Sequence, residues 1–353
     1  MMTMRQFSMK PAMMPATAAI YMADLGEARG RQELFTKQAP QRLKRLRESA
    51  LVESAISSNR IEGVTVSASR VATLVFGRPR PKDRDEAEVR GYRDALNLIH
   101  QQGRRLPVTE ETVLRLHALC RAGSGDAGTY KTIDSDIIEK YADGHQRVRF
   151  RTARADVCRT YLQETLTLWQ EGVAAGWTHP AALMAAANLD FLCIHPFRDG
   201  NGRVSRLLLL LMTYHLGYEV GRYISLERLI EENKDRYYET LEQSSQGWHE
   251  GRHEAWPYIG FVLYILKSAY RELETRVGRT ATPRGAKTEM VLAAIEGLTG
   301  DFNLVGLERA CPGVSRDMIR KVLRELRRTG KVASHGRGPG ACWRKAGTTP
   351  KRG

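Results

Sequence analysis

The sequence lacks a paired-cysteine pattern. Its five cysteines are scattered and odd in number, and no two of them form a Cys-x-x-Cys pair. This distribution argues against a disulfide framework and against a zinc site, and it favours a reducing compartment. The cysteines are Cys120, Cys158, Cys193, Cys311 and Cys342.

Long apolar runs are also missing. The longest one, from Leu207 to Met212, is far too short to span a bilayer. Residues 1–20 are rich in methionine but contain no uninterrupted apolar segment of the kind found in a signal peptide. These absences predict a cytoplasmic protein without a membrane partner.

Acidic residues are scarce in the last quarter of the chain. The 353 residues carry a net charge of +15, and residues 276–353 contain 17 Lys and Arg against 6 Asp and Glu, a net of +11. A local basic excess favours a polyanionic partner. A solvated basic tail has the same composition, so charge alone leaves both interpretations open.

Apolar residues recur at helical spacing through most of the chain. A helix is expected over about residues 40–62, where Leu43, Leu46 and Ala50 share one face and Gly63 follows as a stop. Residues 1–30 are expected to be irregular, and helices to continue to about residue 277. The sequence shows neither internal repeats nor strand–helix alternation, so the main body is predicted to be mainly α.

One β-hairpin is expected within residues 133–152. Asp143-Gly144 signals a tight turn, and Val148 and Phe150 alternate with basic residues. The basic face of this hairpin carries Arg147, Arg149 and Arg151.

The C-terminal quarter predicts a separate small domain. Three short helical segments are followed by a two-stranded ribbon, which is the winged helix-turn-helix pattern. In the last helix Ser315 is a good N-cap, and the apolar positions face inward. Basic residues cover the rest of that helix: Arg316, Arg320, Lys321, Arg324, Arg327 and Arg328.

Such a helix fits a DNA major groove, with Arg337 and Lys345 of the wing on phosphates. A wing that docks onto protein or dimerises has the same pattern, so the partner stays open between DNA and protein.

The stretch "IHPFRDGNGRVSRLLLLLM", residues 194–212, places many polar groups at the start of an apolar helix. A glycine-rich turn before a helix N-terminus offers free backbone N–H groups and a positive dipole end, which together bind anions. Arg203 and Arg206 lie one turn apart and suit a polyphosphate. Asp199 suits Mg²⁺ shared with phosphates, and His195 suits a base near neutral pH. Taken singly, a core histidine and a helix-start carboxylate would explain these two residues equally well.

The run "HPFRDGNGRVSR" resembles the signature of the Fic (Fic/Doc) family. The resemblance implies a Fic helical core with a β-hairpin flap. It also implies transfer of AMP from ATP to a hydroxyl side chain of a target protein, with release of pyrophosphate. In the family the His is the general base, the Asp or Glu holds Mg²⁺, and the Gly-Asn-Gly segment and the arginines hold phosphates. These roles carry over to His195, Asp199, Gly200, Asn201, Gly202, Arg203 and Arg206.

Two further matches refine this expectation. The Doc branch, which resembles kinases in outcome, has Lys where this chain has Gly202, so glycine favours adenylylation. The segment "SSNRIEG" resembles the inhibitory motif of the family, with Ser58 and Glu62 on one helix face. In such proteins the Glu pairs with the second arginine of the signature, here Arg206, and blocks the γ-phosphate of ATP. An ordinary exposed Ser/Glu pair is the alternative.

Weaker matches extend the resemblance over about residues 40–260. Residues 88–96 resemble a family segment that has Asn where this chain has Gly91, and residues 226–241 resemble the segment that lines the adenosine pocket. The second match points to Asn233 and Tyr237, with Tyr238 as a further candidate, although a capping Asn and core tyrosines would also fit. The hairpin lies where the family has its target-docking flap.

The predicted organisation has five parts. They are an N-terminal helical region over 1–100 with an inhibitory helix at about 40–63, a Fic catalytic core over 101–277, a linker over 278–287, a winged helix-turn-helix over 288–346 and a basic tail over 347–353.

The predicted function is an autoinhibited protein adenylyltransferase that uses ATP and Mg²⁺. Its target is a hydroxyl-bearing protein, which includes the chain itself. A nucleotide-sensing DNA-binding regulator and removal of AMP from a target are the alternatives, and a homodimer is left open.

Overall fold

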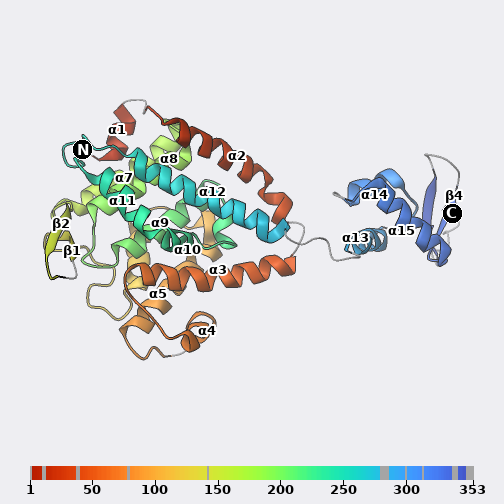
Figure 1. Cartoon of the computed structure of the whole chain (residues 1–353), viewed down its shortest axis with the longest axis horizontal. Coiled ribbons are helices and arrows are strands. Elements are labelled where there is room, and N and C mark those ends of the chain that lie inside the picture. Colours follow the sequence, from red (N-terminus) through yellow and green to blue (C-terminus); the bar gives the residue numbers. More distant parts are fainter. Residues whose placement is uncertain are drawn as a thin grey trace. The chain divides into compact units, whose positions relative to one another are not determined.

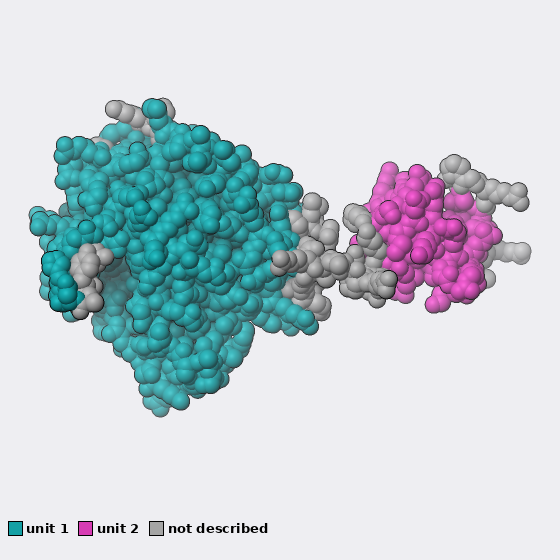
Figure 2. Space-filling view, in the orientation of Figure 1, with its two compact units in different colours: residues 1–277 teal, residues 278–353 magenta. Residues whose placement is uncertain are grey.

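The computed structural model describes residues 2–9, 13–36, 40–77, 80–140, 143–278, 286–298, 300–311, 314–335 and 341–346. The chain divides into two compact units, residues 1–277 and 278–353 (Figure 2). Each unit has its own apolar core. No helix among the described residues is both long enough and apolar enough to cross a membrane.

Two buried helices form the centre of the first unit (Figure 1). Every residue of α8 (Pro180–Ile194) from Ala181 onward is buried, and α9 (Asn201–His215), which packs against it, is buried over most of its length. Helices that are apolar on all sides belong in the middle of a bundle. The loop that joins α8 to α9 carries the polar motif of residues 195–200, so the core holds both ends of that loop.

Other helices surround this pair. They are α5 (Arg84–Gln102), α6 (Glu110–Cys120), α7 (Cys158–Ala175), α10 (Leu226–Glu232), α11 (Lys234–Ser245) and α12 (Trp256–Gly278), with the short helices α4 (Ala68–Phe76), η1 (Gly103–Arg105) and η2 (Val220–Arg222). A Cβ at Gly91 would lie 2.1 Å from the carbonyl oxygen of Leu119. Glycine therefore permits the close approach of α5 to α6, which accounts for the departure from Asn at this position.

The helix expected over residues 40–62 is α3 (Pro40–Ile61), which contacts α5, α9 and α10. Gly63 follows it with a positive φ of 82°. Because α3 reaches α9, its last turn lies beside the start of the motif helix.

The expectation that residues 1–30 are irregular was wrong. They form α1 (Thr3–Met9) and most of α2 (Ala16–Thr36). Small and apolar residues of α2, namely Ala18, Met22, Leu25 and Ala28, are buried at helical spacing. Because two of these four residues are small alanines, the apolar face was hard to recognise in the sequence. Alanine and methionine are nevertheless good helix formers.

The mainly helical body with one hairpin is confirmed. Strands β1 (Asp136–Lys140) and β2 (Gln146–Arg151) pair antiparallel, with a register shift between Ile137 and Ile138. Gly144 has a φ of 86°, and the backbone N–H of His145 donates to Oδ1 of Asp143, which fits the predicted turn.

The second unit contains three helices and a small sheet. The helices are α13 (Ala286–Gly297), α14 (Leu304–Ala310) and α15 (Arg316–Arg328), and the strands are β3 (Phe302–Asn303), β4 (Val332–His335) and β5 (Cys342–Lys345) in the order β3-β5-β4. Strand β3 was not anticipated. Arg337, most of the linker and the basic tail lie outside the described residues.

Candidate active site

His195 lies where α8 ends. It is the only described non-glycine residue with a positive φ, 51°, which turns the chain sharply out of the helix. Its Nδ1 lies 3.2 Å from the carbonyl oxygen of Leu192. A carbonyl accepts only from N–H, so Nδ1 carries the proton and Nε2 is the basic nitrogen of the neutral ring. Burial lowers the pKa of His195 to about 4, and the nearby cation of Lys131 acts in the same direction.

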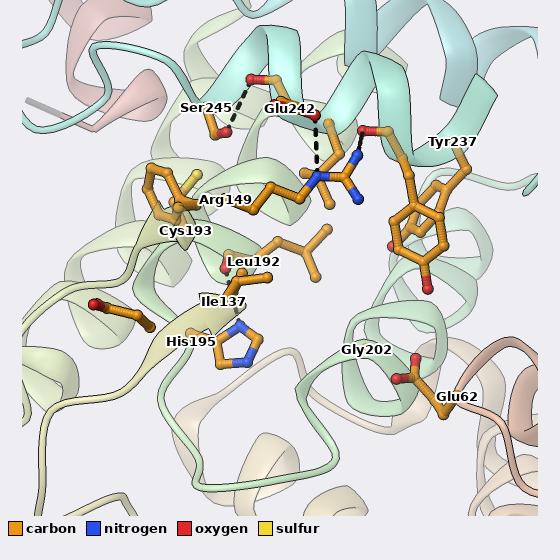
Figure 3. A pocket seen from close by; sticks show the side chains of 14 residues that line it. Glu62, Ile137, Arg149, Leu192, Cys193, His195, Gly202, Tyr237, Glu242 and Ser245 are labelled. Carbon is orange, nitrogen blue, oxygen red and sulfur yellow. Dashed lines mark hydrogen bonds and ion pairs between the residues drawn. The ribbon is translucent and has the colours of Figure 1, made fainter. Parts of the chain in front are cut away.

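A cavity of about 280 Å³ opens beside this histidine (Figure 3). Its wall takes Glu62 from the end of α3, Ile137 from the hairpin, Gly202 from the first turn of α9 and Tyr237 from α11. Segments from four separate parts of the sequence therefore meet around one space that contains the basic nitrogen of His195.

Arg206 and Glu62 form an ion pair at this wall. Nη2 of Arg206 donates to Oε1 of Glu62 over 2.8 Å, and Nε donates to Oγ of Ser58 over 2.8 Å. Burial opposes the charge of the guanidinium, but Glu62 outweighs it and raises the pKa of Arg206. The predicted pairing of Ser58 and Glu62 with Arg206 is the pairing that the structure contains.

The carboxylate of Glu62 lies over the N-terminus of α9. A Cβ added to Gly202 would lie 2.2 Å from Oε1 of Glu62 and 3.2 Å from Nη1 of Arg206. No side chain caps this helix at Gly200, and Nη1 of Arg206 is buried without a hydrogen-bond partner in the described part of the chain. A helix N-terminus next to an unpartnered guanidinium nitrogen is an anion site, and a carboxylate occupies it here.

The loop between His195 and α9 is fixed by its own side chains. Asn201 accepts from the backbone N–H of Phe197 and donates to its carbonyl oxygen, at 2.9 and 2.7 Å. His117 stacks on the Phe197 ring and bridges the carbonyl oxygen of Asp199 to the N–H of Gly128. The side chain of Asn201 thus shapes the loop from within, which differs from the phosphate role implied for it.

Asp199 belongs to a cluster of three arginines and two carboxylates. Arg121 and Arg84 donate to its Oδ2 over 2.7 and 3.0 Å, and Arg203 lies 3.5 Å from its Oδ1. The same three arginines contact the buried carboxylate of Glu88. Burial opposes ionisation of Asp199, but Arg121 and Arg203 outweigh it and lower its pKa.

These contacts bear on two of the expected roles. Arg203 is 2% exposed and its guanidinium points at Glu88, so it holds the loop rather than lining the cavity. Asp199 is 45% exposed at the side chain, and no group of three candidate metal ligands occurs among the described residues. One carboxylate fits Mg²⁺ when phosphates and water supply the other oxygens, once the exposed Arg84 leaves Oδ2.

Of the three residues expected at the adenosine pocket, two line the cavity and one does not. Tyr237 and Tyr238 line the cavity, and burial raises the pKa of both phenols. Asn233 lies between α10 and α11, where its Nδ2 donates to the carbonyl oxygen of Leu229 over 2.8 Å. It is not among the residues that line the cavity, and its adenosine role stays a prediction beside the alternative of a helix-end residue.

The hairpin is anchored to the rest of the unit by its basic face. Arg149 donates to the carboxylate of Glu242 on α11 and to the carbonyl oxygen of Tyr238 (Figure 3). Arg147 also donates to the carboxylate of Glu242. At its base, buried Lys131 donates from Nζ to Oγ1 of Thr152 over 2.6 Å. The strands therefore form one side of the cavity in a fixed position.

Sequence reasoning missed several residues of this site. Glu88 lies in the segment 88–96 that resembles the family, but nothing in the local sequence indicates that it pairs with Arg203. Nor does the local sequence indicate that Arg84 and Arg121 contact Asp199. They are separated from it by 115 and 78 residues. The His-Pro-Phe spacing pointed to His195 but not to His117, which supports the same loop from α6.

The same part of the chain that carries this cavity resembles known proteins. Residues 107–213 match the model of the Fic/DOC family. A curated protein adenylyltransferase Fic from Aedes aegypti is 24% identical over 225 residues, covering 62% of this chain and 41% of that protein. The one from Drosophila melanogaster is 24% identical over 285 residues, covering 74% and 54%. The chain thus spans about half the length of the curated relatives that it matches.

Two crystal structures share the fold. A Fic family protein from Desulfovibrio desulfuricans has a TM-score of 0.62 at 22% identity, covering 97% of this chain and 99% of that one. A Fic domain containing signalling protein from Bacteroides thetaiotaomicron has a TM-score of 0.61 at 20% identity, covering 72% and 97%.

Proposed function

The chain carries a Fic/DOC family domain over residues 107–213, and we propose that it is an autoinhibited protein adenylyltransferase. It would transfer AMP from ATP to a hydroxyl side chain of a target protein, or of the chain itself. One observation carries the proposal: a single cavity joins the basic nitrogen of His195, the start of α9 at Gly202 and the Glu62–Arg206 pair.

The proposed reaction in this cavity transfers one proton from the target hydroxyl and exchanges one P–O bond at the α-phosphorus of ATP. Nε2 of His195 accepts the proton of the target hydroxyl, because that nitrogen is unprotonated near neutral pH. The hydroxyl oxygen forms a bond to the α-phosphorus of ATP, the bond from that phosphorus to the bridging oxygen breaks, and pyrophosphate leaves. The uncapped N-terminus of α9 and the open Nη1 of Arg206 are suited to hold phosphate charge.

Asp199 is the proposed ligand of Mg²⁺, which neutralises phosphate charge when bound. Arg121 supports this role, since it is 7% exposed at the side chain and fixes Oδ2 of Asp199. Arg84 is 66% exposed and can move away at little cost.

Glu62 is the proposed brake. Its carboxylate occupies the position that an anionic phosphate oxygen would take between Gly202 and Arg206. A Lys at position 202 would also clash with it, which agrees with a glycine that serves adenylyl transfer rather than the Doc-type outcome.

The test follows the label from ATP carrying ³²P at the α-phosphate, with Mg²⁺ and a cell lysate as the source of targets. Wild type, Glu62→Gly and the double variant Glu62→Gly/His195→Ala are compared. The proposal expects labelled protein with Glu62→Gly, weak labelling with wild type and none with Glu62→Gly/His195→Ala. Silence of Glu62→Gly with a correctly folded chain would contradict it.

Two alternatives use the same residues. Removal of AMP from a modified target would need Glu62 to orient water, and Glu62 shares the cavity with His195. A DNA-binding regulator that senses nucleotide has no need of a base, so His195 weighs against it. A homodimer and a cytoplasmic location remain predictions, the latter based on the scattered cysteines, which are all free thiols here.

A further inference from the structure

Helix α15 of the second unit presents a basic surface. Its apolar positions Ile319, Val322, Leu323 and Leu326 are buried in the unit's own core. The exposed side of this helix carries six cations, Arg316, Arg320, Lys321, Arg324, Arg327 and Arg328, against the two acids Asp317 and Glu325. The helix is therefore held from one side and leaves a net charge of +4 on the other.

Only part of this charge is neutralised within the unit. Arg328 pairs with Glu325 at 2.6 Å, and Arg316 pairs with Glu308 at 2.9 Å. Arg320 reaches Asp317 only at 3.5 Å. Among the described residues, Lys321, Arg324 and Arg327 have no acidic partner.

A groove runs beside this helix toward the sheet. It has a volume of about 790 Å³, and its wall includes Arg316, Arg320 and Arg324, which follow one another at every turn of α15. Trp343 of strand β5 forms part of the opposite wall. Successive turns are about 5.4 Å apart, so the groove places a row of guanidinium groups next to an aromatic ring.

We propose that this face of the second unit binds duplex DNA, with α15 in a major groove. The 13 residues of α15 make a rod of about 20 Å, and a major groove about 12 Å wide accepts such a helix. Lys321 and Arg324 lie on the side of α15 away from the buried stripe and would reach base edges or phosphates, while Arg316 and Arg320 line the groove beside the wing.

Charge complementarity favours DNA over an apolar protein partner. The large apolar side chains that are exposed in the described part of this unit are Met290 and Val305. They belong to α13 and α14, not to α15. A protein-docking surface at α15 would have to bury unpaired cations, whereas phosphates neutralise them and release counterions.

The wing takes a smaller part than its sequence indicated. Nζ of Lys345 donates to the carbonyl oxygen of Glu296 over 3.0 Å, so this lysine is directed at α13 rather than outward. The proposal therefore rests on α15 and is independent of the transferase activity.

The experiment uses the full chain carrying His195→Ala, so that transfer plays no part. Binding to a fluorescein-labelled mixed-sequence duplex of about 20 base pairs is followed by anisotropy between about 50 and 200 mM salt. We expect the affinity to fall steeply with salt. Lys321→Ala and Arg324→Ala should each reduce affinity several-fold and lower the slope of log affinity against log salt by about 1.

Arg309→Ala is the matched control, because Arg309 is exposed on α14 and its loss changes the net charge equally. It should retain wild-type binding. Failure of the parent chain to bind, equal losses with Arg309→Ala and Arg324→Ala, or equal affinity for single-stranded RNA of the same length would each overturn the proposal. Unchanged thermal unfolding of the variants excludes a folding defect.

Discussion

Arg206 gives two hydrogen bonds to Ser58 of α3 and one to Glu62, which follows the end of that helix. Nε and Nη2 of Arg206 bind the side chain and the carbonyl oxygen of Ser58, while Nη2 also binds Oε1 of Glu62. If Glu62 swings away, Ser58 still holds the guanidinium in place. The proposed brake could therefore open without disordering the arginine that phosphate would need.

ATP affinity should rise when the charge of Glu62 is removed. Glu62→Gln keeps the size of the side chain but cancels the carboxylate that competes with phosphate at Arg206. A hydrogen bond to a charged group contributes about 1.5–3 kcal/mol, so affinity should rise roughly 10-fold or more. Calorimetric titration with a non-transferable ATP analogue and Mg²⁺ measures this.

Ser58→Ala serves as the control for that titration. It removes a contact with Arg206 from the same helix but leaves the Glu62 carboxylate in place. It should not strengthen ATP binding. Equal gains from both variants would show that loosening α3, rather than removing the charge, is what matters.

The end of α3, which carries the proposed brake, is held by a lysine. Nζ of Lys234 donates to the carbonyl oxygen of Ile61 over 3.1 Å, one residue before Glu62. Lys234→Met should release this turn and raise self-labelling of the otherwise wild-type chain roughly 3- to 10-fold, as expected for a contact of about 1 kcal/mol. The rate of label incorporation from α-labelled ATP is the measurement.

A neighbouring ion pair provides the contrast. Arg60 pairs with Glu231 at 3.2 Å, but its side chain is 56% exposed. Exposed pairs contribute little, so Arg60→Ala should change self-labelling less than Lys234→Met. The reverse order would assign the restraint to the surface pair.

Transfer by Glu62→Gly should be insensitive to His195 protonation through neutral pH. The pKa of His195 lies at about 4, and Glu62 is one of the groups that raise it, so removing Glu62 lowers it further. Acid removes the base by protonating Nε2, and the falling limb therefore lies near or below pH 4. An unperturbed histidine would lose half its base form near pH 6.5.

The readout is the initial rate of transfer between pH 5 and 8. A transfer rate that is half-maximal near pH 6.5 would contradict the lowered pKa of His195. Removing Lys131 should raise the pKa of His195, because this cation disfavours the imidazolium.

The sequence predicted the parts of this site that depend on local spacing. The turn, the helix start at Asn201 and the Ser58–Glu62 face all follow from residues within a few positions of one another. The resemblance to known signatures added that Glu62 and Arg206, 144 residues apart, would meet. No local pattern could supply that contact.

Long-range partners are what the sequence could not supply. The phosphate role of Arg203 stays a prediction, and the structure adds that its buried guanidinium donates to Glu88, which pairs its charge. Asn201 satisfies the backbone of Phe197 because that loop is buried and needs its polar groups paired. In both cases the sequence indicated that the residue belongs to the site, but it did not indicate where the side chain points.

Glu88 should contribute strongly to the stability of the first unit. Its carboxylate accepts from Arg121 at 2.9 Å and from Arg203 at 2.8 Å, and both arginines are almost wholly buried. Glu88→Gln would leave buried cations without a full counter-charge, and we expect a loss of about 3–5 kcal/mol in the free energy of unfolding. Urea unfolding followed by tryptophan fluorescence tests this.

Arg84→Ala is the comparison on the same cluster. Arg84 also contacts Glu88, but it is 66% exposed, so its loss should cost less than about 1 kcal/mol. Similar midpoints for the two variants would mean that the cluster is not an important source of stability.

Asp190 should anchor the N-terminal helix to the core. Its buried carboxylate accepts from the backbone N–H groups of Thr3 and Met4, each at 2.8 Å, and from Nε1 of Trp248 at 2.7 Å. Asp190→Ala would strand three buried donors, and we expect a loss of about 3–5 kcal/mol in unfolding free energy. Deleting residues 1–9 should cost a similar amount, although both donors of α1 leave with it.

Thr3→Val provides the matched control. It removes only the hydrogen bond between the Thr3 hydroxyl and Nε2 of His253 and keeps both backbone contacts with Asp190. A neutral hydrogen bond contributes about 1 kcal/mol, so its unfolding midpoint should lie between those of wild type and Asp190→Ala. Asp190 lies in the last part of α8, and His195 follows the end of that helix. Loss of the Asp190 contacts in Asp190→Ala should therefore also broaden the NMR signal of the His195 ring. A sharp signal in Asp190→Ala would separate the stability of α1 from the geometry of the cavity.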